Sequence, residues 1–187
     1  MAVSPRKKSV PSKPSLFSAE ERVVLAGSER APASNAVHVK STPARSKVTV
    51  SVIVKRKEEL KINKRGGRAA GPVRVSRTEY KRRHSADPDA LKQVKRFAKE
   101  YNLTVESDPT SALRRTVQLT GAAADIQKAF GVELHQKTID GTEYRLREGG
   151  IHLPKSLAGH VEAVLGLDNR PQAQPHFRVH KPGKGAA

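Results

Sequence analysis

A run of alternating β-branched residues, Val48 to Val54, constrains the fold of this chain more than any other feature. Valine recurs at every second position, and Thr49, Ser51 and Ile53 fill the positions between. Successive side chains of an extended strand point to opposite faces, and β-branched residues favour strands. The run therefore predicts a β-strand with one face entirely of valine, and the other elements must provide its neighbours and its cover.

Two later segments have the spacing of amphipathic helices. The first begins at Asp87-Pro88, since Asp is a frequent N-cap and Pro suits the first helical position, and its apolar residues recur as far as Tyr101. The second runs from Thr120 to Gly131, a residue that often ends helices. A short helix is predicted at 76–83. Another is predicted after Pro154, with a buried face of Leu157, Val161, Val164 and Leu165.

The order of the elements predicts the fold class. Further strands are expected at 103–106, 115–119 and 132–139, so that the core reads strand, helix, strand, strand, helix, strand. This is the α+β, ferredoxin-like βαββαβ pattern, an antiparallel sheet with both helices on one face. Asp140-Gly141 is a typical two-residue turn and predicts an appended C-terminal hairpin with a strand at 142–147.

Composition along the chain suggests three parts. Residues 1–21 are rich in Ser, Pro and Lys without apolar periodicity, which predicts a disordered basic N-terminal segment. Residues 22–168 are expected to form the folded domain, with a compact core at about 47–168. Residues 169–187 are polar and rich in Pro, which predicts an extended linker.

Several kinds of chemistry lack the residues they need. The chain has no Cys, no Gly-x-Ser-x-Gly and no HExxH, so neither an enzyme nor a metal or cofactor site is expected in it. His176 and His180 stand four apart in the Pro-rich tail without a Glu between them. No apolar run reaches the length of a membrane span, and no ordinary signal peptide is recognisable at residues 1–17.

The positive charge is unevenly distributed. The formal net charge is +18, of which residues 1–86 contribute +15 (21 Lys and Arg against 6 Asp and Glu). Such a charge attracts nucleic acid, anionic lipid or an acidic protein surface. A basic ferredoxin-like nucleic-acid-binding domain is therefore an alternative, although the basic runs lack the interleaved aromatic residues on which bases stack.

Several short motifs, in this order and spacing, resemble the activation domain of kumamolisin-type sedolisins, the serine-carboxyl peptidases. At position 26 Ala replaces the family's Pro. The motifs are VLAGSER at 24–30, SRTEY at 76–80, RHSADP at 83–88, RRTV at 114–117, AFGVEL at 129–134, GTEYR at 141–145, IHLP at 151–154 and VLGLDNRP at 164–171.

The resemblance implies a propeptide that acts as intramolecular chaperone and inhibitor of a following protease domain and is removed by self-cleavage at acidic pH. That cognate protease domain would be the partner, with neither nucleic acid nor membrane expected, and calcium would bind only in it. The catalytic Ser, Glu and Asp of such enzymes are not found in this chain. We expect a monomer in an extracellular or periplasmic location.

The linker is the predicted functional site. Pro171 and Pro175 favour extended backbone at the residues before them, and a protease cleft binds extended peptide. With the resemblance, the linker residues expected in the cleft are Arg170, Pro171, Pro175, His176, Phe177 and Arg178. From the residues alone, a tail that is merely accessible remains the alternative.

Overall fold

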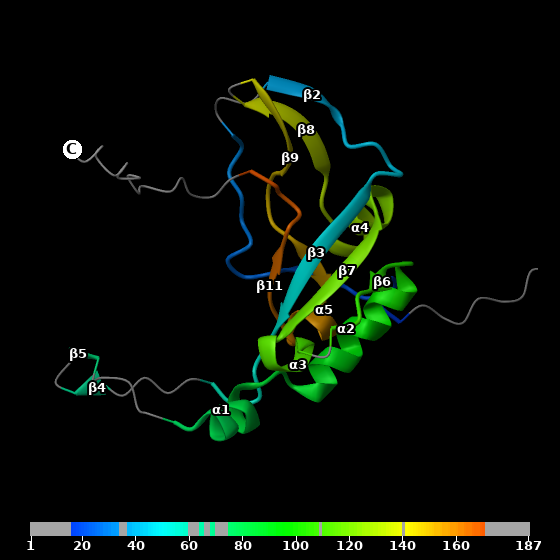
Figure 1. Ribbon diagram of the computed structural model, residues 1–187. Coiled ribbons are helices and arrows are strands. Elements are labelled where there is room, and N and C mark those ends of the chain that lie inside the picture. Colours follow the sequence, from blue (N-terminus) through cyan, green and yellow to red (C-terminus); the bar gives the residue numbers. More distant parts are fainter. Residues whose placement is uncertain are drawn as a thin grey trace, which may run out of the picture.

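The computed structural model describes residues 16–33, 37–59, 64–65, 68–69, 75–108, 110–139 and 141–170. These residues form an α+β fold with antiparallel sheets and five helices (Figure 1). The strands are β1 (Arg22–Val24), β2 (Val37–Ser41), β3 (Lys47–Val54), β4 (Lys64–Arg65), β5 (Arg68–Ala69), β6 (Thr104–Val105), β7 (Thr116–Ala122), β8 (Leu134–Ile139), β9 (Thr142–Arg147), β10 (His152–Pro154) and β11 (Val161–Leu165). The helices are α1 (Arg77–His84), α2 (Pro88–Glu100), α3 (Ser111–Arg114), α4 (Ala123–Phe130) and α5 (Lys155–Ala158).

The strand predicted at 48–54 is confirmed and lies inside the main sheet. The sheet order is β11-β3-β7-β6, with every neighbouring pair antiparallel. The register of β3 on β7 runs from Lys47↔Ala122 to Ile53↔Thr116. All four valines of β3 are at most 2 % exposed, so the alternation in the sequence divides the sheet into a buried and an outer face.

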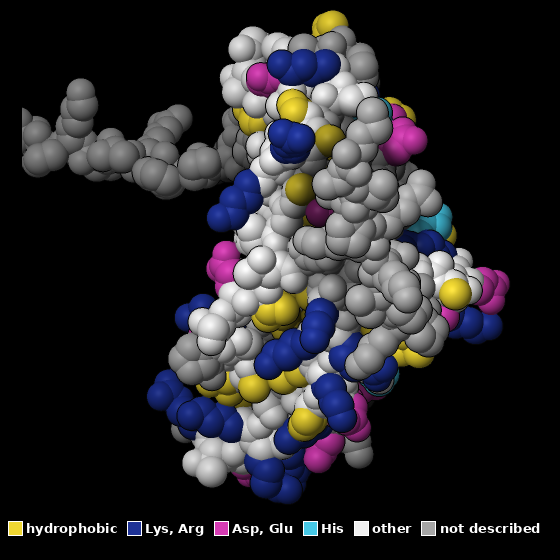
Figure 2. All heavy atoms as spheres, turned by 90° about the vertical axis from the view of Figure 1, so that its right-hand side faces the viewer, with side chains coloured by type: hydrophobic (Ala, Val, Ile, Leu, Met, Phe, Trp, Pro, Cys, Tyr) yellow, Lys and Arg dark blue, Asp and Glu magenta, His cyan; other side chains and the backbone are white. Residues whose placement is uncertain are grey.

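Helix α2 covers the valine face, as its spacing predicts. Its N-cap Asp87 accepts a hydrogen bond from the backbone N–H of Asp89, and Pro88 occupies the first turn. Its buried side consists of Ala90, Val94, Phe97 and Ala98. The opposite side of α2 carries Lys and Arg. Figure 2 views the molecule from this side and shows dark blue side chains gathered over the lower half of the molecule.

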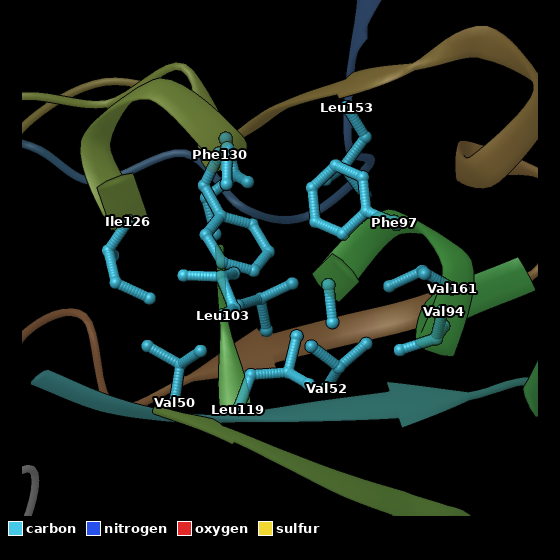
Figure 3. Close-up of a cluster of buried hydrophobic side chains, with 14 of the residues drawn as sticks. Val50, Val52, Val94, Phe97, Leu103, Leu119, Ile126, Phe130, Leu153 and Val161 are labelled. Atoms are coloured by element: carbon cyan, nitrogen blue, oxygen red, sulfur yellow. The ribbon is translucent and has the colours of Figure 1, made fainter. Parts of the chain in front are cut away.

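Three aromatic rings organise the core between the helices and the sheet. The Phe97 ring centroid lies 5.6 Å from that of Phe130 on α4 and 4.9 Å from that of Tyr101. Figure 3 shows Phe97 and Phe130 above Val50 and Val52 of β3 and Leu119 of β7. Gly131 ends α4 with a φ of 57°, as the sequence predicts. In the described parts of the chain, no helix combines the length and the apolar character needed to cross a bilayer.

The predicted strand at 132–139 forms as β8 but belongs to a different sheet. It lies between β2 and β9 in a three-stranded antiparallel sheet, and β11 takes the place beside β3. The reason is the supply of buried apolar side chains. Leu134 is the one fully buried residue of β8, whereas β11 contributes Val161 and Val164 to the core. The position predicted for 132–139 in the main sheet was therefore wrong.

The helix predicted after Pro154 is also corrected. Only Lys155–Ala158 is helical, and Val161–Leu165 is strand β11. The register of β11 on β3 shifts between Val161 and Ala163, which places Val161 and Val164 on the same face. A bulge thus produces the i, i+3 spacing that imitates a helix. Leu165, predicted to be buried, is 55 % exposed.

The loop predicted at 55–71 contains a short ribbon. Strands β4 and β5 pair antiparallel through Lys64↔Ala69 and Arg65↔Arg68. Directly after β3, an isolated antiparallel β-bridge between Arg56 and Ala86 holds the beginning of this segment. This connection joins the main sheet to α1, an eight-residue helix without a buried side chain.

The first described residues pack on the core, five positions before the boundary expected at residue 21. Phe17 is 1 % exposed, and its ring meets that of Phe97 edge-on at 5.7 Å. The Glu100 carboxylate at the end of α2 accepts hydrogen bonds from the backbone N–H groups of Leu16, Phe17 and Ser18 at 2.8–3.1 Å. A charge-assisted set of this kind fixes Phe17 against the end of α2.

We predict that Phe17→Ala lowers the free energy of unfolding by about 3–5 kcal/mol, because it removes a fully buried ring and leaves a cavity beside Phe97. Urea denaturation followed by circular dichroism measures the change. Leu16→Ala is the matched control, since Leu16 is 48 % exposed and keeps its backbone bond to Glu100. Equal destabilisation by both substitutions would contradict the anchoring role of Phe17.

Candidate functional site

The main sheet has one face that the helices leave uncovered, which we call the open face. It is formed by the side chains of Thr49, Ser51 and Ile53 on β3 and their directly opposite neighbours, among them Gln118 and Leu165. Thr49, Gln118 and Leu165 are exposed, and Ser51 and Ile53 are half-buried. None of these positions carries a charge, so the centre of the open face is a neutral surface of small polar and aliphatic side chains, and Lys47 at the start of β3 stands at its edge.

Hydrogen bonds order the polar side chains of the open face. The hydroxyl oxygens of Thr49 and Thr120 lie 2.8 Å apart, and the Thr120 hydroxyl donates to a Glu106 carboxylate oxygen at 3.2 Å. At the other end of the sheet, the Arg115 guanidinium bonds to Glu162 and donates to the carbonyl oxygen of Val54. The charged groups therefore border the face, and its centre is free for packing against another surface.

The chain leaves β11 through a segment held by Arg145 of β9. The Arg145 guanidinium donates to the carbonyl oxygens of Gly166 (2.8 Å) and Leu167 (3.1 Å). Its backbone N–H donates to the Asn169 side-chain oxygen at 2.6 Å, and its carbonyl accepts from the Asn169 N–H at 3.0 Å. We call Arg145 together with Gly166–Arg170 the exit clamp. Burial lowers the pKa of Arg145, and Asp168 opposes that shift.

Gly166 allows the chain to turn closely past β3. Its φ is 90°, a left-handed conformation that favours glycine. A Cβ atom at this position would lie 2.9 Å from the carbonyl oxygen of Thr49. The turn therefore depends on the absence of a side chain, and it directs the chain from β11 toward β9.

Asp168 and Arg170 close the exit clamp with a local ion pair. The Asp168 carboxylate accepts the Arg170 backbone N–H at 2.9 Å and the guanidinium Nη2 at 2.6 Å. The side chains are 5 % and 19 % exposed, respectively. The hydrogen bond to Asp168 is the main reason that the pKa of Arg170 is raised. The last described residues thus have a defined direction when they leave the domain.

A buried arginine fixes the turn after β1. The Arg147 guanidinium donates to the carbonyl oxygens of Ser28 (2.7 Å) and Gly149 (2.6 Å), and burial lowers its pKa. The Ser28 hydroxyl accepts from the Ile151 N–H at 2.9 Å. A groove runs between this turn and β11, ending at Asp168. The VLAGSER segment therefore has a structural role beside the chain exit.

The chain matches a known family. The family model described as "Pro-kumamolisin, activation domain" matches residues 34–170. The chain belongs to this family. It is also 33 % identical over 171 residues to "Kumamolisin" from Bacillus sp. (strain MN-32), which covers 89 % of this chain and 31 % of that protein. The chain thus spans about a third of the length of that relative.

In this pro-kumamolisin activation domain, the family match ends at Arg170, inside the exit clamp. Of the predicted site residues only Arg170 is described. Pro171, Pro175, His176, Phe177 and Arg178 lie outside the described residues. Among the described residues, no group of three or more His, Cys, Asp and Glu could hold a metal ion.

The sequence patterns do not predict the roles of Arg145 and Asn169 in the exit clamp. Both lie in segments that carry the family resemblance, at 141–145 and 164–171. No local pattern indicates that an arginine of one strand holds the chain that leaves another. The resemblance itself was the only signal at these positions, and it did not distinguish binding from structural roles.

We predict that Arg145→Met opens the exit clamp of the activation domain. The change removes the charged donors to Gly166 and Leu167 but keeps the aliphatic side chain, and each such bond contributes about 1.5–3 kcal/mol. Hydrogen exchange of the Asn169 amide should become at least about tenfold faster, while exchange in β3 stays the same. Arg114→Met, at an arginine whose side chain is 70 % exposed, is the control. Unchanged Asn169 exchange would contradict the clamp.

Proposed function

We propose that this chain is the propeptide of a secreted acid serine-carboxyl endopeptidase, in which it acts as intramolecular chaperone and cleft-blocking inhibitor and is removed by self-cleavage at acidic pH. The observation that carries the proposal is the exit clamp beside an uncovered sheet face, in a chain of the activation-domain family. Because the exit clamp fixes the chain at Gly166–Arg170, the linker starts in one direction relative to a protein bound on the open face.

The open face is the surface that we assign to the protease domain. Its neutral mixture of Ile53, Leu165 and small polar side chains resembles the composition of non-obligate interfaces, in which apolar contacts are accompanied by hydrogen bonds. We also assign the main sheet to the ferredoxin-like arrangement. If β11 is counted as the fourth strand, β3, β6, β7 and β11 follow the order 4-1-3-2 across the sheet.

The linker at 169–187 completes the inhibitor in this proposal. Pro171 and Pro175 favour an extended peptide, and Arg170 to Arg178 would occupy the cleft. Because the linker is tethered, its effective concentration at the cleft is millimolar or higher for a short connection, so modest contacts suffice. The chain itself supplies no catalytic group, and calcium belongs to the protease domain.

The alternative, a nucleic-acid-binding sheet, finds no support on the open face. Sheets that bind single strands present aromatic side chains on which bases stack. Among the described residues, the open-face positions of β3, β7 and β11 carry no aromatic side chain, and Phe17, Phe97 and Phe130 are buried in the core.

We predict that the full chain, added in trans, inhibits its cognate protease at near-neutral pH and loses affinity as the pH falls. Acidification protonates carboxylates of the protease, and it charges histidines, whose ordinary pKa is about 6.5. Inhibition constants measured by peptide hydrolysis over a pH series test this. A chain truncated after Arg170 keeps the folded domain and should inhibit more weakly. Equal inhibition at acidic and near-neutral pH would refute the electrostatic release.

That comparison needs a folding control, because acid also acts on the domain. The hydrogen bond from Lys137 lowers the pKa of Glu148. A carboxyl group with a lowered folded pKa stabilises the fold above its unfolded pKa, and this contribution is lost as the pH falls through the folded pKa. Circular dichroism over the same pH series separates release of a folded inhibitor from its unfolding.

We also predict that the chain raises the refolding yield of the denatured protease domain. Secreted proteases often persist because unfolding is slow, so a bound template that lowers the folding barrier can be discarded afterwards. The measurement is recovered activity with and without the chain, after removal of the inhibitor by acid. Phe17→Ala, which weakens the fold of the chain, provides a control of identical length and should give a smaller yield. Identical yields with and without the chain would exclude the chaperone role.

A further inference from the structure

Helix α2 carries a row of cations on its outer side. Four of its residues follow the spacing i, i+3, i+4, i+7, so they lie on one face of the helix over about 10 Å. We call them the cationic stripe. They are Lys92, Lys95, Arg96 and Lys99, all exposed.

The stripe points away from the sheet. The residues that α2 buries against the valine face, Ala90, Val94, Phe97 and Ala98, occupy the opposite side of the helix. The open face lies on the other surface of the sheet, so a partner bound there does not reach the stripe. A basic surface can meet an acidic protein, but a protein that docks on the open face leaves these cations without a role.

No carboxylate forms an ion pair with the stripe within the described residues, although Glu106 and Asp108 line a depression together with Lys95. Its four cations form no ion pair there, and α2 itself offers only Asp89 in its first turn and Glu100 at its end. The Glu100 carboxylate is occupied by backbone N–H groups of residues 16–18. The positive charge of the stripe is therefore available to an external anion.

Apolar groups accompany the cations. Pro88 and Leu91 line a shallow depression together with the stripe, and Figure 2 shows yellow side chains between the dark blue ones. Leu16, 48 % exposed, is held at the end of α2 by its bond to Glu100. The broad apolar face of α2 is buried in the core, so these few exposed apolar groups can supplement, but not replace, the attraction of the cations to anionic headgroups.

We propose that the cationic stripe binds an anionic lipid surface. All four residues of the stripe are exposed on one side of a single helix, so they can approach a flat array of headgroups together. Lipid phosphates attract Lys and Arg directly, and Leu16 adds an apolar contact. A single-stranded nucleic acid would require stacking aromatics, which the stripe does not have. This site is independent of the proposed inhibitor function, and both surfaces can be occupied together.

The test is co-sedimentation of the full chain with vesicles of phosphatidylcholine alone and of phosphatidylcholine with phosphatidylglycerol. We expect binding to the anionic vesicles only, weakening as salt is added. Lys95→Gln with Arg96→Gln should lower the partition coefficient roughly thirtyfold, because each surface cation contributes about 1 kcal/mol. Leu16→Ala should weaken vesicle binding and leave binding to a DNA duplex unchanged.

The matched control is Arg45→Gln with Lys47→Gln, which removes the same charge from exposed positions outside α2. An equal loss in this control would overturn the assignment to the stripe and leave only the effect of net charge. Equal binding to neutral vesicles would overturn the electrostatic basis. Tighter binding to a DNA duplex than to vesicles, at equal phosphate and salt concentrations, would identify nucleic acid as the partner instead.

Discussion

The packing of Phe97 against the valine face of β3 is the interaction on which the rest of the structure depends. Phe97 contacts the rings of Phe17, Tyr101 and Phe130, so it joins the first described residues, the end of α2 and the end of α4. Because one side of α2 and one side of β3 are used for this packing, their other sides must face outward. The cationic stripe and the open face are these two remaining surfaces, and they necessarily point in opposite directions.

Local periodicity was sufficient to predict the elements that build this layer. The alternation at 48–54, the cap at Asp87-Pro88 and the stop at Gly131 each depend on neighbours within a few residues, and the structure confirms all three. What the sequence could not determine was strand pairing. The bulge at Val161/Ala163 gives strand β11 the apolar spacing of a helix. Because this segment was predicted to be helical, β8 was assigned to the place in the main sheet that β11 occupies.

The site depended even more on contacts between distant residues. Glu100 binds backbone groups more than 80 positions earlier, and Arg145 holds backbone carbonyls more than 20 positions later. A side chain that donates to a backbone carbonyl places no demand on the identity of the residue that it binds. Such contacts therefore leave no complementary pair in the sequence, and the family resemblance located the segments but not their roles.

The net charge likewise predicts a kind of partner without locating the surface that binds it. A value of +18 predicts an anionic partner, yet it says nothing about which face the partner meets. In the structure the centre of the open face is neutral, and the cations of α2 lie on the opposite side of the main sheet. Charge complementarity with a protease bound on the open face could then act at its borders, near Lys47, Glu106 and Arg115. The proposed second partner rests on the unpaired charge of α2, and the apolar groups in the same depression favour a lipid surface over a simple polyanion.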